Sequence, residues 1–507
     1  MRDGSPEDLS SLAETLAPGE QFYRRAGARL SAPPAPSVNR VSQTPAALHT
    51  GYHAFDLAHA LMLHEQGLLP PDVGRRMLEG LLTLEDETGD PTPARESIGR
   101  GAHSGEVHLT DKYGEAVGGW LHTGRSSHDL SAVASRYVLR DRLLTVGSSL
   151  VDLIETYAAR ADSYASVPMP TYTGLQRAQV GTIGYRLCSQ AFPLTRDLGR
   201  LVACYDRLNR SPAGAAAGTT TDFAIDRERV ASLLGFDDVL ENAEDIDKSA
   251  DHLLEVGFTI ATSAATVGRA ADTFFVWFSD EFGVVDLPDK LCGTSSIMPQ
   301  KRNPHSVQTV QRETNEIIGE AIQQFLAIKN LSGGVQYDPA LLSRFTETLD
   351  TFRAVVDGAT FDTDRARALV TADWALATDL AALLTKECEI PWRSAHQIVA
   401  VLVREYEATD RCLTEVSAAD LEAIAEAYLG DRPTIPTAAL ETLCDPAQAP
   451  ARRADVIGSP APEQVADQLT TLRARAEMYR DRLSERRVAL DQARATRRSA
   501  IRSVIDA

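Results

Sequence analysis

The chain has 507 residues and a net charge of −20, which argues against general binding to nucleic acid or to acidic membranes. It has no apolar run long enough to cross a bilayer and no charged-then-apolar secretory start. Its six cysteines are widely separated and show no CxxC spacing, which favours a reduced, cytoplasmic protein. Abundant Ala, Arg, Asp and Leu with few aromatic residues predict a mostly helical chain.

The first half of the chain changes from irregular to helical patterns. Residues 1–50 include "SAPPAPSVNRVSQTP", which is too rich in Pro and Ser to predict an element. A helical pattern runs from Phe55 to Leu84 and is broken at "GLLPPD", where Asp72 suits a helix start. After "HTGRSSHD", one helix face is marked by Leu130, Val133, Tyr137, Leu144, Val151 and Ile154.

The second half repeats this pattern and then changes to shorter elements. A second long stripe comprises Leu253, Val256, Ile260, Val267, Ala271, Phe274 and Phe278. Residues 305–330 are again helical, and shorter helices begin near residue 375. We therefore predict an all-α protein with an N-terminal helical domain (1–125), a central bundle of long helices (126–375) and a C-terminal helical domain (376–507).

One polar stretch interrupts the helices. "CGTSSIMPQKRNP", residues 292–304, carries two prolines that exclude a continuous helix, and no apolar period survives in it. Loops with many hydroxyl, cationic and amide groups often bind ligands, although a solvated surface connection has the same composition. His103 and His108 in "HSGEVH" are five residues apart, off the HExxH spacing, so a zinc site there is improbable.

This loop resembles the signature loop of the fumarase/aspartase superfamily, whose pattern is close to G-S-S-x-M-P-x-K-x-N-P. The matching residues are Ser295, Ser296, Met298, Pro299, Lys301, Asn303 and Pro304, whereas Thr294 stands where the pattern has glycine. Within that superfamily the chain is most similar to argininosuccinate lyase. The similar segments are "FDLAHALMLHEQGLL" (55–69), "VGGWLHTGRSSHDL" (117–130), "MPTYTGLQRAQ" (169–179) and "TDLAALLTKECEIPWRSAHQIV" (378–399).

The resemblance implies a three-domain fold and a homotetramer whose bundles form a twenty-helix core. Each active site would then take the 123–129, 171–177 and 293–303 segments from three different subunits. The implied partner is a small dicarboxylate, either fumarate or an N-substituted aspartate, and no metal or organic cofactor is implied.

The resemblance also implies roles for the matching residues. Members of the family remove a proton next to a carboxylate, so they need a base and positive groups for the resulting aci-carboxylate. Ser295 would be the base, and Lys301 with loop amides would stabilise its alkoxide. Substrate-binding groups would be Thr123, Arg125, Ser126, Ser127, Thr173, Gln176, Ser296, Met298 and Asn303, with Lys301 assisting.

Several positions depart from the family pattern. The family's catalytic histidine is replaced by Gly174, and the glutamate that supports it is replaced by Gln308. The Arg-Asn pair of its R-S-R-N-D segment is Ser127 and His128 here, and its Y-N-K-D region is "VQYDPALL" (335–342). Because both members of the histidine–carboxylate pair are absent, we expect altered chemistry at the amine half of the site.

Three functions therefore stay open. The first is a lyase that releases fumarate from an N-substituted aspartate other than argininosuccinate. Its leaving group would be weakly basic, like hydrazine or nitrite, or His128 would act as the acid with the adjacent Asp129 setting its pKa. The second is a true argininosuccinate lyase, and the third is a non-catalytic scaffold.

Overall fold

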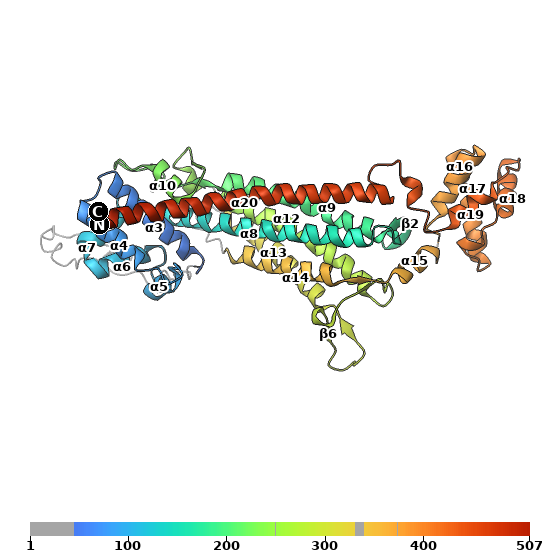
Figure 1. Cartoon of the computed structure of the whole chain (residues 1–507), viewed down its shortest axis with the longest axis horizontal. Coiled ribbons are helices and arrows are strands. Elements are labelled where there is room, and N and C mark those ends of the chain that lie inside the picture. The colour runs from blue at the N-terminus through green and yellow to red at the C-terminus, as the bar shows by residue number, and fades with distance from the viewer. Residues whose placement is uncertain (1–44, 249, 330–338, 373) are drawn as a thin grey trace, which may run out of the picture.

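The structure is a computed structural model, and it describes residues 45–248, 250–329, 339–372 and 374–507. Most of the segment expected to be irregular, 1–50, lies outside these residues, as do residues 335–338 of "VQYDPALL". The molecule is elongated, with a helical domain at each end of a long bundle (Figure 1).

The N-terminal domain is built around one deeply buried helix, α3 (Leu48–Glu65). Nearly all of its side chains are buried, including the polar residues His53, Asp56 and His59, so it lies inside the domain rather than on its surface. The surrounding elements are α4 (Pro71–Leu82), α5 (Thr92–Ile98), η1 (Gly101–His103), α6 (Ser104–Tyr113), α7 (Glu115–Gly118) and η2 (Gly119–His122).

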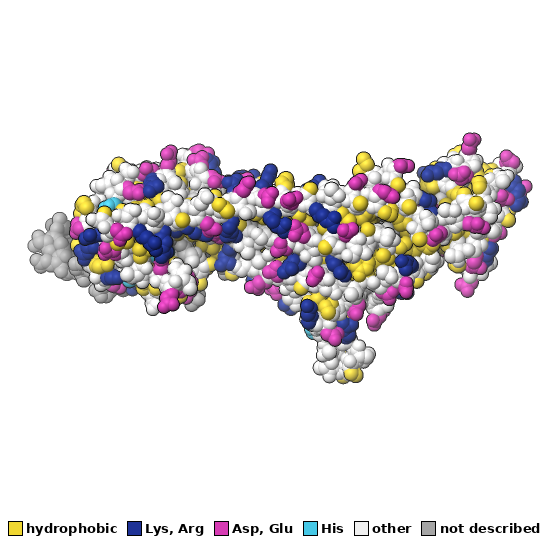
Figure 2. Space-filling view, in the orientation of Figure 1, with side chains coloured by type: hydrophobic (Ala, Val, Ile, Leu, Met, Phe, Trp, Pro, Cys, Tyr) yellow, Lys and Arg dark blue, Asp and Glu magenta, His cyan; other side chains and the backbone are white. Residues whose placement is uncertain are grey.

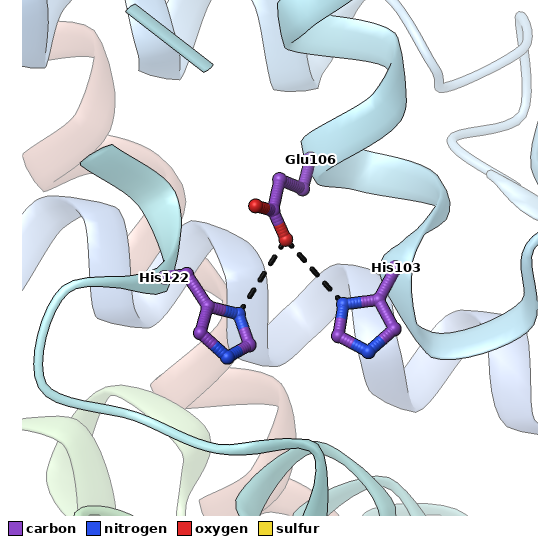
Figure 3. Close-up of side chains that lie close together, drawn as sticks. All are labelled: His103, Glu106 and His122. Carbon is purple, nitrogen blue, oxygen red and sulfur yellow. Dashed lines mark hydrogen bonds and ion pairs between the residues drawn. The ribbon is translucent and has the colours of Figure 1, made fainter. Parts of the chain in front are cut away.

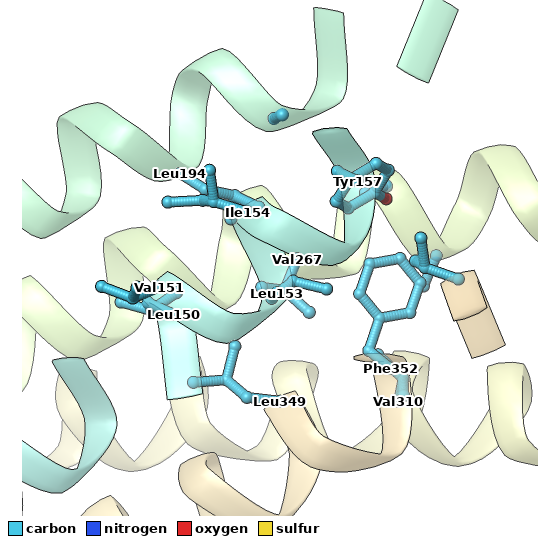
Figure 4. Packing of buried hydrophobic residues seen from close by; sticks show 14 of the residues in the cluster. Leu150, Val151, Leu153, Ile154, Tyr157, Leu194, Val267, Val310, Leu349 and Phe352 are labelled. Atoms are coloured by element: carbon cyan, nitrogen blue, oxygen red, sulfur yellow. The ribbon is translucent and has the colours of Figure 1, made fainter. Parts of the chain in front are cut away.

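The central bundle confirms the all-α prediction. Its long helices are α8 (Ser127–Ser163), α9 (Ile183–Leu208), α12 (Asp251–Phe278), α13 (His305–Ile328) and α14 (Ala340–Gly358). The predicted stripe from Leu130 to Ile154 is buried along α8, and that of α12 is buried except for the half-buried Phe278. Figure 4 shows Leu150, Ile154 and Tyr157 of α8 packed among side chains from the neighbouring helices.

The predicted C-terminal domain, 376–507, requires a correction. Residues 374–449, with α16 (Ala377–Cys388), α17 (Trp392–Ala408), α18 (Ala418–Leu429) and α19 (Thr437–Cys444), pack around a core of their own. The last helix, α20 (Pro462–Asp506), instead runs back along α8 and α9 (Figure 1). The physical reason is an apolar stripe that joins the bundle core: Val465, Leu469, Leu472, Ala476, Leu483 and Leu490.

Short strands connect the helices. The largest pair is the hairpin of β1 (Pro168–Thr173) and β2 (Gln176–Thr182), which the sequence did not predict. The other pairs are β3 (Arg210–Ser211) with β4 (Asp238–Val239), β5 (Val285–Asp286) with β8 (Thr360–Phe361), and β6 (Gly293–Thr294) with β7 (Arg302–Asn303). The remaining helices are η3 (Asp289–Leu291), η4 (Leu413–Glu415), η5 (Ala451–Arg453), α10 (Arg227–Leu234), α11 (Asp245–Lys248) and α15 (Thr363–Thr371). Within the described ranges, no helix is both long and apolar enough to cross a membrane.

Candidate active site

The 123–129 segment forms the start of helix α8. Ser126 is its N-cap: the Ser126 hydroxyl accepts a hydrogen bond from the His128 amide at 3.1 Å. The Asp129 carboxylate accepts one from the Ser126 amide at 3.0 Å, which completes a capping box. The other Asp129 oxygen accepts the Ala216 amide at 3.1 Å. Burial raises the pKa of Asp129 to about 6, and both of its oxygens accept hydrogen bonds from the backbone.

Arg125, one of the predicted substrate-binding residues, has a buried side chain that is paired within the chain. Its side chain is 1% exposed and forms an ion pair with Asp56 at 2.8 Å. Asp56 also pairs with the buried Arg95 at 2.6 Å. Although burial raises the pKa of Asp56, Arg125 and Arg95 together hold it below its usual value. The charge of Arg125 is neutralised by a buried carboxylate, so this residue attaches the 123–129 segment to the N-terminal domain.

The backbone of Thr123 is fixed by a hydrogen bond to the N-terminal domain. His59 Nε2 donates to the Thr123 carbonyl at 2.8 Å. Burial, and next the charge of Arg125, lower the pKa of His59 to about 3, so this histidine is a neutral donor. The fixed backbone leaves Ser127 and His128 exposed at the first turn of α8.

Three side chains meet beside Ser127, and the sequence did not predict their grouping. Figure 3 shows the Glu106 carboxylate between the imidazoles of His103 and His122. One oxygen of Glu106 lies 3.4 Å from the Nδ1 atom of each histidine. His103 Nε2 lies 2.9 Å from the Ser127 hydroxyl. His108, the other histidine of "HSGEVH", lies apart from this group, and its Nε2 atom is 2.9 Å from the Thr83 hydroxyl.

The same group is the one place, among the residues that the structure describes, where three potential metal ligands converge. The donor atoms of His103, Glu106 and His122 all lie within 4.8 Å of one another. Two imidazole nitrogens and one carboxylate are a donor set that divalent transition metals accept. Without a metal, His103 forms a long hydrogen bond with Glu106, and His122 lies at ion-pair distance from the same oxygen.

The second predicted segment is the tip of the β1–β2 hairpin. Thr173 and Gln176 face each other across a two-residue turn, and both are exposed. The turn residues Gly174 and Leu175 have φ angles of +56° and +61°, as a type I′ turn requires. Gly174, which replaces the family's histidine, therefore offers no side chain at the most projecting point of the hairpin.

The third segment, the 292–304 loop, is closed at its base by a small antiparallel ladder. Gly293 pairs with Asn303, and Thr294 pairs with Arg302. Arg302 anchors this base through ion pairs of 2.9 Å to Asp286 and 3.1 Å to Asp289. The tip, residues 295–301, projects from the bundle beyond β6 (Figure 1).

Inside the loop tip, the predicted base is surrounded by backbone donors. The Ser295 hydroxyl oxygen accepts hydrogen bonds from the amides of Met298 at 3.1 Å and Ile297 at 3.3 Å. These amides would stabilise negative charge on that oxygen. Lys301 Nζ donates to the Asn303 side-chain oxygen at 2.6 Å, so the two predicted carboxylate ligands lie together. Ser296 and Met298 are exposed on the tip.

One chain does not bring the three segments together. Helix α8 separates 123–129 from the hairpin: its 37 residues span about 55 Å at a rise of about 1.5 Å per residue. The loop tip stands apart from both in Figure 1. Two surface cavities of about 610 Å³ and 560 Å³ are lined by none of the predicted site residues.

Comparison with known proteins places these segments in a family. A lyase family model matches residues 92–319, and a model of the argininosuccinate lyase C-terminal region matches residues 374–447. The chain is 34% identical over 459 residues to argininosuccinate lyase of Methanococcoides burtonii, which covers 89% of this chain and 90% of that protein. It is 30% identical over 439 residues to argininosuccinate lyase of Methanocaldococcus jannaschii, with 85% and 89% covered.

Solved structures agree with this placement. EDDS lyase in complex with formate superposes with a TM-score of 0.85 at 25% identity, covering 97% of both chains. An EDDS lyase variant with bound fumarate gives a TM-score of 0.86 at the same identity and coverage. Fold and loop thus define an all-α lyase of the fumarate-releasing, carbon–nitrogen class. The chain belongs to the fumarase/aspartase superfamily, in its argininosuccinate lyase-like branch.

Proposed function

We propose that the protein cleaves the carbon–nitrogen bond of an N-substituted aspartate other than argininosuccinate and releases fumarate. One observation carries this proposal: the residues expected to act on the dicarboxylate part of the substrate are retained, whereas those expected to assist the amine are replaced. The Ser295 hydroxyl accepts hydrogen bonds from two loop amides, and Lys301 donates to Asn303 within the same loop. Gly174 and Gln308 stand where the family's histidine and glutamate would assist the amine.

We propose that the active enzyme is a homotetramer with composite sites. The α8 segment and the hairpin lie too far apart in one chain to touch one small substrate. The neighbouring helices α12 and α13 also expose large apolar side chains, which a second copy would cover: Phe258 (42% exposed), Phe275 (38%), Ile322 (52%), Phe325 (43%) and Leu326 (52%). On the face drawn in Figure 2, hydrophobic side chains also lie among charged residues along the bundle.

Within the composite site, Ser295 removes the proton next to the carboxylate, and the Lys301–Asn303 pair binds the carboxylate that gains charge. Thr173 and Gln176 add polar contacts from the hairpin of another subunit. Ser126 and Ser127 face the substrate from the start of α8, while Arg125 positions that segment through Asp56. A cytoplasmic location is proposed with this role, supported by six cysteines that are all free thiols.

The substrate is tested by following the ultraviolet absorbance of fumarate. Purified enzyme is incubated with argininosuccinate, N-(2-aminoethyl)aspartate, N-methylaspartate, 2-hydrazinosuccinate and 2-nitrosuccinate. We expect fumarate from at least one of the last four and none from argininosuccinate. A kcat/KM for argininosuccinate above about 10⁴ M⁻¹s⁻¹ would instead identify a true argininosuccinate lyase.

A further inference from the structure

We infer that Ser127, backed by His103 and Glu106, delivers the proton that the departing amine nitrogen needs. This inference rests on the proposed function and names its substrate class: N-substituted aspartates whose leaving group is a basic amine. It locates a histidine–carboxylate pair in the N-terminal domain, although the pair expected at positions 174 and 308 is absent.

The three side chains form a continuous chain of polar contacts. The Ser127 hydroxyl lies 2.9 Å from His103 Nε2, and His103 Nδ1 lies 3.4 Å from a Glu106 oxygen. His103 ends η1 and precedes α6, whereas Ser127 is the first residue of α8, so the contact joins two elements at the exposed start of α8. The order hydroxyl, imidazole, carboxylate is the arrangement in which an imidazole moves protons for a hydroxyl.

Charge and burial suit this role. The Glu106 side chain is 8% exposed, whereas His103 is 22% exposed. Burial alone would raise the pKa of Glu106, but hydrogen bonds from His103 and His122 lower it to about 2. The carboxylate of Glu106 contacts the His103 imidazole and would stabilise a positive charge on it.

The alternative acid, His128, is exposed at the same turn of α8. Both oxygens of the neighbouring Asp129 accept backbone amides, from Ser126 and from Ala216. His103 has its carboxylate in contact, and it reaches the same turn of α8 through Ser127.

The proton balance of the step is complete. Protonated His103 donates through Nε2–H to the Ser127 oxygen, and the Ser127 hydroxyl proton passes to the substrate nitrogen. As the carbon–nitrogen bond breaks, its electron pair stays on nitrogen and takes that proton, while the aci-carboxylate electrons form the double bond of fumarate. His103 is left neutral and is reprotonated by solvent, and Ser295 releases to solvent the carbon proton that it removed. No oxidant, reductant or further co-reactant is needed.

The test compares leaving groups in matched variants. His103→Asn, Ser127→Ala and Glu106→Gln are assayed as whole purified enzyme with N-(2-aminoethyl)aspartate and with 2-nitrosuccinate. We expect kcat for the amine substrate to fall by roughly 10²–10⁴ in His103→Asn and Ser127→Ala, with KM little changed. Elimination of nitrite should fall much less, because nitrite leaves without a proton. If these residues had a purely structural role, the variants would lower kcat equally for both substrates, and this result would overturn the inference.

Two further variants make the result specific. His108→Asn alters a histidine of α6, the helix of Glu106, whose Nε2 contacts Thr83 and the Gly80 carbonyl instead, and it should leave both rates unchanged. If His128→Asn loses amine turnover while His103→Asn keeps it, His128 is the acid and the relay is refuted. If the wild-type enzyme eliminates only nitrite, no acid is required and the relay again fails, but the proposed function stands. If it releases fumarate from no N-substituted aspartate, the proposed function itself fails.

A metal ion on the same side chains is a separate outcome of this test. Wild-type enzyme is assayed after dialysis against EDTA and after addition of Zn²⁺, and its metal content is measured. Unchanged amine turnover without bound metal is expected for the proton relay. Activity that disappears with EDTA and returns with Zn²⁺ would show that His103, Glu106 and His122 hold a metal, and would overturn the relay.

Discussion

Gly293 packs directly against the imidazole of His305: a methyl group added at Gly293 would lie 1.9 Å from His305 Nδ1. The two residues bracket the signature loop, with Gly293 opening it in β6 and His305 beginning α13. A methyl group at Gly293 would therefore force either the His305 ring or the loop base to move.

We predict that Gly293→Ala displaces the loop and lowers turnover by about tenfold or more, because the base Ser295 lies two residues further along. The double variant Gly293→Ala/His305→Ala removes the ring that the methyl group meets, and it should recover most of the loss. Steady-state kinetics with the best substrate of the panel provide the measurement. Equal activity of the single and double variants would show that the contact does not position the loop.

A second prediction concerns the base itself. Ser295→Ala removes the hydroxyl that accepts the Ile297 and Met298 amides but takes no side chain from the core. Turnover should fall by roughly a thousandfold or more, while sedimentation and thermal unfolding stay as in wild type. Ser306→Ala, at the start of α13, is the matched control. Near-normal rates in Ser295→Ala would refute the assignment of the base.

Much of the fold could be predicted because the long helices carry clear apolar periods. The stripe of α8 from Leu130 to Ile154 is one example. Helix α20 was assigned to the C-terminal helical domain rather than to the bundle, although Val465, Leu469, Leu472, Ala476, Leu483 and Leu490 are spaced 4, 3, 4, 7 and 7. That heptad-like period was a usable signal, hidden among many arginines, and it marks a helix that packs along a partner.

The candidate site was predictable only where motif and local structure coincide. The loop and the start of α8 could be located because their residues are contiguous. The ion pair of Arg125 with Asp56 could not be predicted from the sequence, because it joins segments 69 residues apart and depends on α3 being buried. The grouping of His103 with His122 likewise depends on how η1, α6 and η2 fold together, and no sequence spacing expresses that.

A third prediction follows from the buried carboxylate of Asp129, whose pKa rises from 3.8 to about 6 in the folded protein. Because the folded-state pKa is the higher one, protonation favours folding. This contribution is complete below about pH 3.8 and is lost as the pH rises through about 6. Replacing Asp129 with Asn removes the titration. The stability of wild type relative to Asp129→Asn should therefore decline by roughly 2.5 kcal/mol between about pH 4 and pH 7.5.

Urea unfolding at fixed protein concentration measures this difference, since the stability of an oligomer depends on concentration. Asp111→Asn, an exposed carboxylate on α6, serves as the control and should show no comparable change with pH. If the difference in unfolding free energy between wild type and Asp129→Asn stays constant with pH, Asp129 is not desolvated in the native assembly.

The last prediction concerns the composite site and the exposed face of α12 and α13. Phe258 and Phe325 meet there with ring centroids 5.6 Å apart, yet the two side chains are 42% and 43% exposed. Phe325→Arg places a charge in a surface that a second copy should bury, where an unpaired charge costs several kcal/mol. Sedimentation velocity should show the tetramer dissociating, and turnover should disappear with it because no single chain holds all three segments. Val488→Arg, a similarly exposed apolar residue of α20 at 51%, should keep both assembly and activity. A stable monomer of Phe325→Arg with full turnover would contradict the composite site, because the start of α8 and the hairpin lie at opposite ends of a helix about 55 Å long.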